Sequence, residues 1–291
     1  MKKSIFIVVL IVSVFGKIWA QKPESWTDPG KSYRTALELF EREKFGAAQK
    51  LFDRVASETA GEMRVISDYY SAVCAYKMLS QDAGTRLTSF IRSHSTSPKI
   101  NQARFYLGNY LFNTRSYNQA LEMYTQTDAY ELPPTDLAEF YFKAGYCRLS
   151  NGNREGARTY FYEVKDGQSP YAAQASYYYG HILYSEGKYE NALREFNKLT
   201  GHEDYKAIIP FYITQIYYRQ GKYEELLRVA PPLLENTSGS QKADIARMIG
   251  DACFRLEDYS RAYDYLLIHK QLSKKQPDRK QIGRASCRER V

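Results

Sequence analysis

Apolar side chains recur along this chain with the period of an α-helix, separated by polar residues. After a polar break at Gly187-Lys188, apolar residues recur three or four positions apart, a spacing that lines one face of a helix and not of a strand. The glycine of the break suits the left-handed conformation that ends a preceding helix. Similar breaks lie at Gly152 and Gly221, so the pattern predicts pairs of helices joined by short turns. The apolar positions after the break at Gly187 are Tyr189, Ala192, Leu193, Phe196 and Leu199.

Small residues mark one unit that is repeated about seven times along the chain. A helical hairpin of this size cannot bury its apolar face alone, so neighbouring hairpins must stack, with small residues where two helices approach closely. The first small residue of each repeat, here called the anchor, recurs every 34 to 37 residues: Ala36, Ala72, Gly108, Gly145, Gly180, Thr214 and Gly250. Twelve positions after each anchor stand Ala48, Gly84, Ala120, Ala157, Ala192, Leu226 and Ala262.

These positions resemble the tetratricopeptide repeat. That family has a small residue at its eighth position, an aromatic at the seventeenth, Ala at the twentieth and a large apolar residue at the twenty-fourth, and Gly180, Tyr189, Ala192 and Phe196 match them in order. The resemblance covers residues 30–270. It implies an all-α fold, a right-handed superhelical solenoid of about seven helical hairpins, without a β-sheet.

Repeats two and six depart most from the family pattern. Gln81 and, in repeat four, Arg154 stand where the family has an aromatic residue. Thr88 and Ala230 replace the large apolar residue, and Thr214 and Leu226 replace small residues. In repeat six, Pro231-Pro232 falls inside the expected second helix, which predicts that this helix is cut short or kinked. Four other prolines fall between repeats: Pro98, Pro133, Pro134 and Pro170.

The same resemblance implies where a partner would bind. In the family, the first helix of each hairpin lines the concave groove through residues three before, one after and four after the anchor. The candidate partner-binding residues are Asn109, Phe112, Phe142, Tyr146, Tyr177, His181, Tyr184, Phe211, Gln215 and Tyr218; the same positions also hold Phe105, Leu149, Arg247, Asp251 and Phe254. Tyrosine offers contact area and a polar tip, which suits peptide recognition. The alternative for each ring is packing between adjacent first helices, whereas Asn109, His181 and Gln215 are polar and less easily explained as core.

The first twenty residues have the composition of a signal peptide. Lys2 and Lys3 precede a twelve-residue apolar run from Ile5 to Gly16, and Ala20 is a small residue suited to cleavage before Gln21. An uncleaved anchor is the alternative, although the run is shorter than the roughly 20 residues of a membrane span. We expect residues 1–20 to be a signal peptide, 21–29 a linker, and the protein to be exported, in the periplasm of a Gram-negative envelope. Membrane contact is expected only if the signal stays uncleaved.

Residues 282–291 resemble a translated sequencing adapter, because the codons ATC GGA AGA GCG TCG TGT AGG GAA AGA GTG reproduce Ile-Gly-Arg-Ala-Ser-Cys-Arg-Glu-Arg-Val. We therefore interpret 282–291 as an artefactual tail and 271–281 as a truncated further repeat or linker. The native C-terminus would then be missing.

The charge, the cysteines and the motifs of the sequence argue against several classes of function. Without the signal and the tail, the net charge of +8 falls to +3, which disfavours nucleic-acid binding. Cys74, Cys147 and Cys253 lie on first helices of different repeats, too far apart for disulfides, and are expected to be buried free thiols. The four histidines share no metal-ligand spacing, and no phosphate loop, nucleophile elbow or His-Glu-x-x-His motif occurs. The sequence predicts no enzyme, no cofactor and no metal.

Two functions remain open at this stage. In the first, an exported scaffold binds a peptide segment or partner protein in its groove, in envelope assembly or trafficking. In the second, the repeats are the periplasmic sensor half of a signalling protein whose transmembrane and output domains are missing from this sequence. The partner and the oligomeric state are not predicted.

Overall fold

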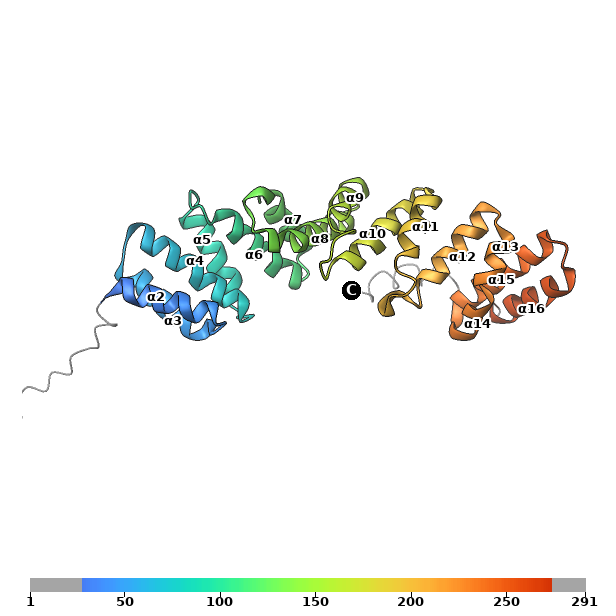
Figure 1. The fold of residues 1–291 in the computed structure, drawn as a ribbon, viewed down its shortest axis with the longest axis horizontal. Coiled ribbons are helices and arrows are strands. Elements are labelled where there is room, and N and C mark those ends of the chain that lie inside the picture. Colours follow the sequence, from blue (N-terminus) through green and yellow to red (C-terminus); the bar gives the residue numbers. More distant parts are fainter. Residues whose placement is uncertain (1–27, 274–291) are drawn as a thin grey trace, which may run out of the picture. The chain divides into compact units, whose positions relative to one another are not determined.

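The computed structural model describes residues 28–273, which form fifteen α-helices and two short 3₁₀ helices and contain no strand (Figure 1). The predicted all-α solenoid of helical hairpins is confirmed. The helices group into two compact units, which meet in sequence at Pro133 and Pro134. Each unit is described by itself, and the right-handed sense of the whole superhelix stays a prediction.

The first unit holds repeats one to three. Each repeat has a first helix, which carries the anchor, and a second helix, which packs back against it. These helices are α2 (Pro29–Glu41), α3 (Phe45–Glu58), α4 (Gly61–Lys77), α5 (Ala83–Ser93), α6 (Ile100–Asn113) and α7 (Tyr117–Thr125), followed by the 3₁₀ helix η2 (Ala129–Glu131).

The second unit holds repeats four to seven. Its elements are α8 (Pro134–Ser150), α9 (Arg154–Tyr162), α10 (Ala172–Ser185), α11 (Tyr189–Asn197), η3 (Glu203–Tyr205), α12 (Ile209–Gln220), α13 (Tyr223–Val229), α14 (Pro231–Asn236), α15 (Gly239–Arg255) and α16 (Tyr259–Ser273). The predicted break in repeat six is confirmed, because α13 ends at Val229 and α14 starts at Pro231. Proline lacks the amide hydrogen that a continuous helix would need there.

All fourteen small-residue positions are buried, which confirms that the recurring residues mark helix contacts. A Cβ atom placed on Gly108 would lie 2.6 Å from the Tyr124 ring, and one placed on Gly180 would lie 2.9 Å from the Phe196 ring. In both repeats the ring comes sixteen residues after the anchor. In repeat six the sizes are reversed, with Thr214 as anchor and Ala230 sixteen residues later, both fully buried. Repeat six therefore has the larger anchor, Thr214, together with the smaller partner, Ala230.

In each repeat, the residue seven positions after the anchor lies in the turn between the two helices and has a left-handed backbone conformation. The predicted glycine turns are confirmed, with φ between 68° and 79° at Gly152, Gly187 and Gly221. In the other four repeats a residue with a side chain adopts this conformation, which costs about 1 to 2 kcal/mol relative to glycine's freedom there. These residues are Glu43 (φ 57°), Leu79 (φ 55°), Arg115 (φ 61°) and Glu257 (φ 64°).

Arg115→Gly is expected to stabilise the protein by about 0.5 to 1 kcal/mol, and Gly187→Ala to destabilise it by about 1 kcal/mol. The turns are equivalent: the amides of Arg115 and Gly187 donate to carbonyls three residues earlier, at 2.9 and 3.1 Å. Urea unfolding measures both changes. Gly201→Ala is the control, because Gly201 has no positive φ and nothing within 4 Å of its Cβ position. The free energy of unfolding should rise for Arg115→Gly and fall for Gly187→Ala. Changes in the same direction would contradict the shared turn conformation.

The three cysteines of the described residues are buried free thiols, as predicted. Burial raises the pKa of Cys74 and of Cys147 to about 12, so both thiols stay protonated and unreactive at neutral pH. The predicted signal peptide and artefactual tail lie outside the described residues. Among the helices that are described, none combines the length and the apolar character of a membrane span.

Candidate partner-binding surface

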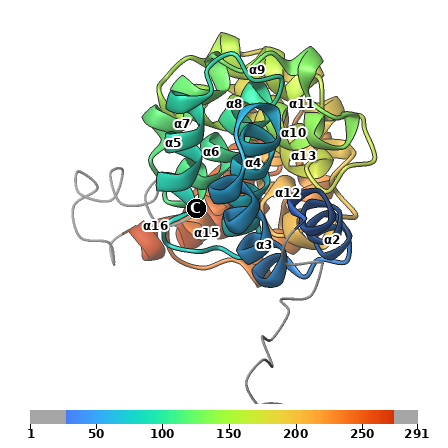
Figure 2. The same ribbon diagram turned by 90° about the vertical axis from the view of Figure 1, so that its left-hand side faces the viewer.

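The predicted surface positions of the second unit lie on the first helices α8, α10, α12 and α15. Seen along the stack, the second helices α9 and α11 lie at the outer edge of this unit, and α10 and α12 lie inside them (Figure 2). Partly buried side chains dominate the set. Tyr146 meets Tyr178 edge to face at 5.5 Å between ring centroids, and Phe211 packs into the core cluster around α15.

Tyr184 links α10 to α12 through polar contacts. Its hydroxyl donates to Gln215 Oε1 at 2.8 Å and accepts from Arg219 Nε at 3.3 Å, and the Arg219 guanidinium lies 5.8 Å from the centre of the tyrosine ring. Gln215 is one of the candidate partner-binding residues. Its side-chain oxygen instead accepts from the preceding repeat.

The same contact recurs one repeat later, between α12 and α15. The Tyr218 hydroxyl donates to Asp251 Oδ2 at 2.8 Å, and Arg247 Nη1 donates to the same carboxylate at 3.1 Å. Burial, followed by the hydrogen bond to Asp251, raises the pKa of Tyr218. A tyrosine four residues after one anchor thus pairs with the polar residue one after the next anchor, and this contact joins adjacent first helices.

Asn109, Phe105 and Phe142 lie in the core and offer no accessible surface. Asn109 is 1% exposed, and its Oδ1 accepts from the Tyr124 hydroxyl at 2.7 Å. The reason is local: repeat three has a tyrosine where repeats four and five have phenylalanine, and a buried phenol needs an acceptor. Phe142 stacks on Tyr171, with ring centroids 5.2 Å apart. Phe112, in the first unit, remains partly exposed beside Tyr117.

An open cleft of about 280 Å³ brings together three of the predicted positions. Tyr177 stacks on Tyr205 at 5.3 Å, and His181 meets Tyr212 edge to face at 5.5 Å, so the rings are held by their neighbours. The cleft lies between the end of α8, the start of α9 and the middle of α10. Its lining includes Leu149, Arg154, Tyr177, Tyr178, His181 and Ser185.

The cleft carries one permanent charge. Burial, and secondarily the charge of Arg154, lowers the pKa of His181, so its imidazole is neutral at pH 7. Burial raises the pKa of Tyr177, which keeps its phenol neutral as well. Arg154, whose side chain is exposed, is therefore the cationic donor of a cleft otherwise lined by aromatic and hydroxyl groups.

Sequence reasoning missed Arg154 as a site residue and also missed the tyrosine two positions before the anchor. Tyr212 contacts Tyr177, His181, Tyr184 and Phe196, and so holds the cleft side chains in place. The signal was present in the sequence, since Tyr70, Tyr106, Tyr178 and Tyr212 all stand two residues before an anchor.

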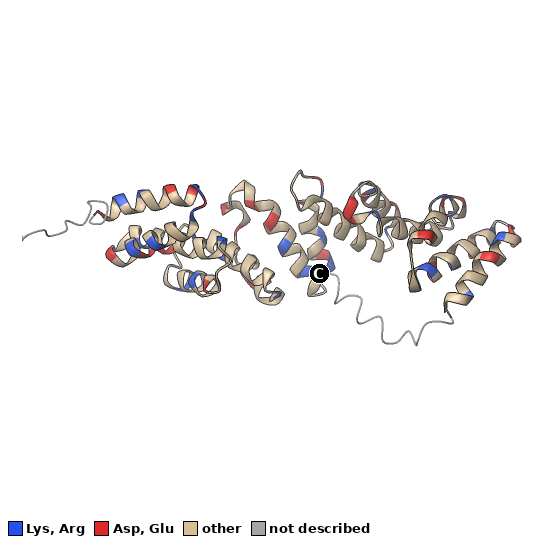
Figure 3. Cartoon of the chain, turned by 90° about the horizontal axis from the view of Figure 1, so that it is seen from below, with Lys and Arg blue, Asp and Glu red and all other residues tan. Residues whose placement is uncertain are grey.

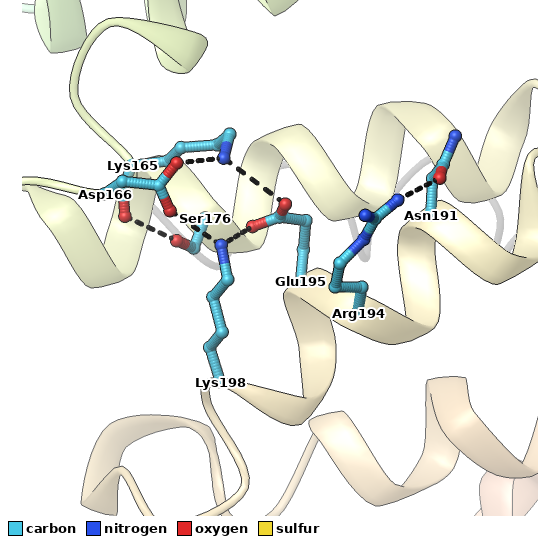
Figure 4. Close-up of polar contacts among 7 residues, drawn as sticks. All are labelled: Lys165, Asp166, Ser176, Asn191, Arg194, Glu195 and Lys198. Carbon is cyan, nitrogen blue, oxygen red and sulfur yellow. Dashed lines mark hydrogen bonds and ion pairs between the residues drawn. The ribbon is translucent and has the colours of Figure 1, made fainter.

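A second polar cluster lies between α9, α10 and α11 (Figure 4). The Lys165 ammonium, with a side chain only 6% exposed, lies 3.4 Å from Glu195 Oε1 and also contacts Asp166. The rings of Tyr162 and Tyr179 flank it at 5.0 and 5.3 Å. Because Lys165, Lys198, Asp166 and Glu195 each have an opposite charge as partner, we interpret this ion-pair network as structural.

No metal centre is seen in the part of the chain that the structure describes. No group of three His, Cys, Asp or Glu side chains is close enough to hold a metal ion within residues 28–273. Basic and acidic residues are interspersed along the helices of each unit (Figure 3).

Comparison with known proteins identifies the repeat. The tetratricopeptide repeat family matches residues 142–204, which hold α9, α10, α11 and most of α8. A search of functionally curated proteins gives no significant match.

Several solved structures share the fold at low sequence identity. YrrB, described as a TPR protein with an unusual peptide-binding site, aligns with a TM-score of 0.52 at 18% identity, over 65% of this chain and 93% of its own. The C-terminal part of a TPR protein from Cytophaga hutchinsonii aligns with a TM-score of 0.51 at 16% identity. The alignment covers 84% of this chain and 96% of that structure. The MamA RS-1 ArsTM double mutant aligns with a TM-score of 0.50 at 16% identity. The alignment covers 61% of this chain and 97% of that structure.

Proposed function

Because residues 142–204 form tetratricopeptide repeats, we propose that this protein is a scaffold that binds an extended peptide segment of a partner protein in the cleft beside α10. The observation that carries the proposal is the cleft itself, where Leu149, Tyr177 and His181, all groove positions in the family, line an open volume of about 280 Å³. A peptide-binding site is described for YrrB, whose fold is similar.

The chemistry of the cleft favours a peptide with an acidic group next to an apolar or aromatic side chain. The Arg154 guanidinium can donate two parallel hydrogen bonds to a carboxylate. The faces of Tyr177 and Tyr178 offer apolar area, and the Ser185 hydroxyl can donate to or accept from a peptide backbone.

We further propose that this scaffold acts in the cell envelope. Its support is the signal-like segment of residues 1–20, with Lys2 and Lys3 before the apolar run. A periplasmic scaffold would present the cleft to envelope proteins during assembly or trafficking. Detection of the mature N-terminus at Gln21 in a periplasmic fraction would support export.

Arg154→Ala is expected to weaken peptide binding about fivefold or more, a loss of about 1 kcal/mol that only a minority of interface residues reach on truncation. The probe is the tightest peptide that the full chain selects from a random display library, and fluorescence anisotropy measures its Kd. Thermal stability should stay the same, because the Arg154 side chain is exposed.

Arg194→Ala is the matched control, since Arg194 is also an exposed arginine at a second helix, but on α11 and outside this cleft. Equal Kd values for Arg154→Ala and the wild type would refute binding in the cleft. An equal loss in both arginine variants would show that only net charge matters.

A further inference from the structure

Repeat two lacks the buried ring that repeats one, three, four and five have sixteen residues after the anchor. In repeats one, four and five this ring is a phenylalanine that stacks on the tyrosine two residues before the next anchor, with centroids 5.1 to 5.4 Å apart. Repeat two has Thr88 at this position, and Thr88 is only partly buried. A threonine has too little volume to fill the space that a phenyl ring occupies in the other repeats.

A tyrosine of the next first helix lies beside this position. Tyr110 stands two residues after its anchor, where repeats two and four to seven have a buried cysteine, isoleucine or alanine. Its ring lies against Gly84 of α5, where a Cβ atom would be only 2.5 Å away. Tyr110 also packs against the apolar cluster that contains Ala72, the anchor of repeat two. The Tyr110 ring is therefore inserted between α5 and α6.

An open pocket of about 480 Å³ lies between α5 and α6 at this point. Its volume is within the range of sites that bind small molecules. From α6 come the apolar surfaces of Leu107, Leu111 and the Tyr110 ring. From α5 come hydroxyl groups and one guanidinium, carried by Thr85, Thr88, Ser89, Arg92 and Ser93.

The polar lining of this pocket is rich in donors and contains no carboxylate among the described residues. Arg92 is exposed and has no hydrogen-bond or ion-pair partner within residues 28–273. A guanidinium can only donate, and its planar fork fits a carboxylate or a phosphate. The hydroxyl groups of Ser89, Ser93 and Tyr110 can donate to the same kind of group. The pocket is therefore complementary to an oxyanion next to an apolar group.

A smaller pocket of about 250 Å³, between α3, α4 and α5, differs because its cations are paired. Arg86 Nη1 lies 2.9 Å from Asp53 Oδ1, and His94 Nε2 lies 3.0 Å from Asp68 Oδ2. Arg64 Nε lies 3.8 Å from the same Asp68 oxygen. These pairs hold the three helices together, so of the two pockets only the one between α5 and α6 has a cation without a partner.

We propose that the pocket between α5 and α6 binds a small organic molecule that carries a carboxylate or phosphate group on an apolar or aromatic moiety. Arg92 would hold the oxyanion, with further hydrogen bonds from Ser89 and Ser93, and the apolar moiety would cover Leu107 and Leu111. This site lies in the first unit, and the peptide cleft at α10 lies in the second. Neither site needs the other.

Fluorine NMR with fluorophenyl phosphate as the probe tests the pocket. The full chain should bind the probe saturably at millimolar concentration or below, and inorganic phosphate should bind more weakly because it lacks the ring. Arg92→Gln should weaken binding about tenfold or more, since hydrogen bonds from a charged donor are lost. The fold should be unchanged, because Arg92 is exposed.

Thr88→Phe should also weaken binding, because it places a ring at a position that lines the pocket. Repeat one accommodates the equivalent pair, Ala36 and Phe52, with both residues fully buried, so the variant should fold. Arg34→Gln is the matched control: Arg34 is an exposed arginine of the first unit that lies on α2, outside the pocket. Arg34→Gln and Arg154→Ala should both bind the probe as the wild type does.

Fluorobenzoate distinguishes the two oxyanions. Tighter binding of the benzoate favours a carboxylate ligand, and tighter binding of the phosphate ester favours a phosphate ligand. The proposal is overturned if neither probe binds saturably, or if inorganic phosphate binds as tightly as the ester. It is also overturned by wild-type affinity in Arg92→Gln or in a Thr88→Phe variant of normal melting temperature, and by an equal loss in Arg34→Gln. Loss of the probe in Arg154→Ala would place it in the peptide cleft instead.

Discussion

Phe196→Ala is expected to destabilise the protein by about 3 to 5 kcal/mol, and Gly180→Thr by about 1 to 3 kcal/mol, whereas the double variant loses clearly less than the sum. The Phe196 ring is fully buried against Gly180, where any Cβ would lie 2.9 Å from it. The double variant recreates the pair of Thr214 and Ala230, which repeat six accommodates at the same two positions.

A double-mutant cycle in urea measures this coupling. We expect an interaction free energy of about 1 to 3 kcal/mol in favour of the double variant, since the two sites share one volume. Gly201→Thr is the control for the helix-independent effect of adding a side chain, because its Cβ position is open. Strict additivity of the two single variants would contradict the volume pairing.

The anchors and the hairpins could be predicted from the sequence because steric contact selects residue size, which is visible in one chain. Gly108, Gly145 and Gly180 each face a ring sixteen residues later, so both members recur with the repeat. The left-handed turns of repeats one, two, three and seven could not be found in this way. Glu43 and Arg115 have no preference for positive φ, and packing of the two flanking helices overrides their local propensity.

Residue spacing singled out three positions that line one cleft, but it did not predict the contacts of the other candidate residues. Tyr177, His181 and Leu149 do line a cleft, whereas Gln215 and Asn109 accept hydrogen bonds from tyrosines. A tyrosine in a stacked repeat can pack by its ring and still require an acceptor for its hydroxyl. The acceptor lies in the same repeat for Tyr124 and in the next repeat for Tyr184, and residue spacing alone does not determine which.

Glu195→Gln is expected to destabilise the protein by about 3 kcal/mol, because it removes one partner of a buried ion pair. The side chains of Lys165 and Glu195 are 6% and 7% exposed, and Lys198 donates to the second Glu195 oxygen at 2.7 Å (Figure 4). With a neutral amide at position 195, the buried Lys165 ammonium would retain only the exposed Asp166 carboxylate. Urea unfolding at neutral pH measures the loss.

The matched control is Glu203→Gln, since Glu203 pairs with Lys206 at the surface and should contribute less than about 1 kcal/mol. Lys165→Met together with Glu195→Leu removes both buried charges and should recover much of the stability, which a simple loss of packing would not allow.

Acid adds a second test of the same cluster. Hydrogen bonds from Lys165 and then Lys198 lower the pKa of Asp166, so its contribution is present above the ordinary carboxyl pKa of about 4 and is lost as the pH falls through the lowered value. Asp166→Asn should therefore flatten the acid limb of the stability curve slightly, because this carboxylate is mostly exposed. If Glu195→Gln costs no more than Glu203→Gln, water reaches Lys165 in solution, and the cluster does not stabilise the packing of α9, α10 and α11.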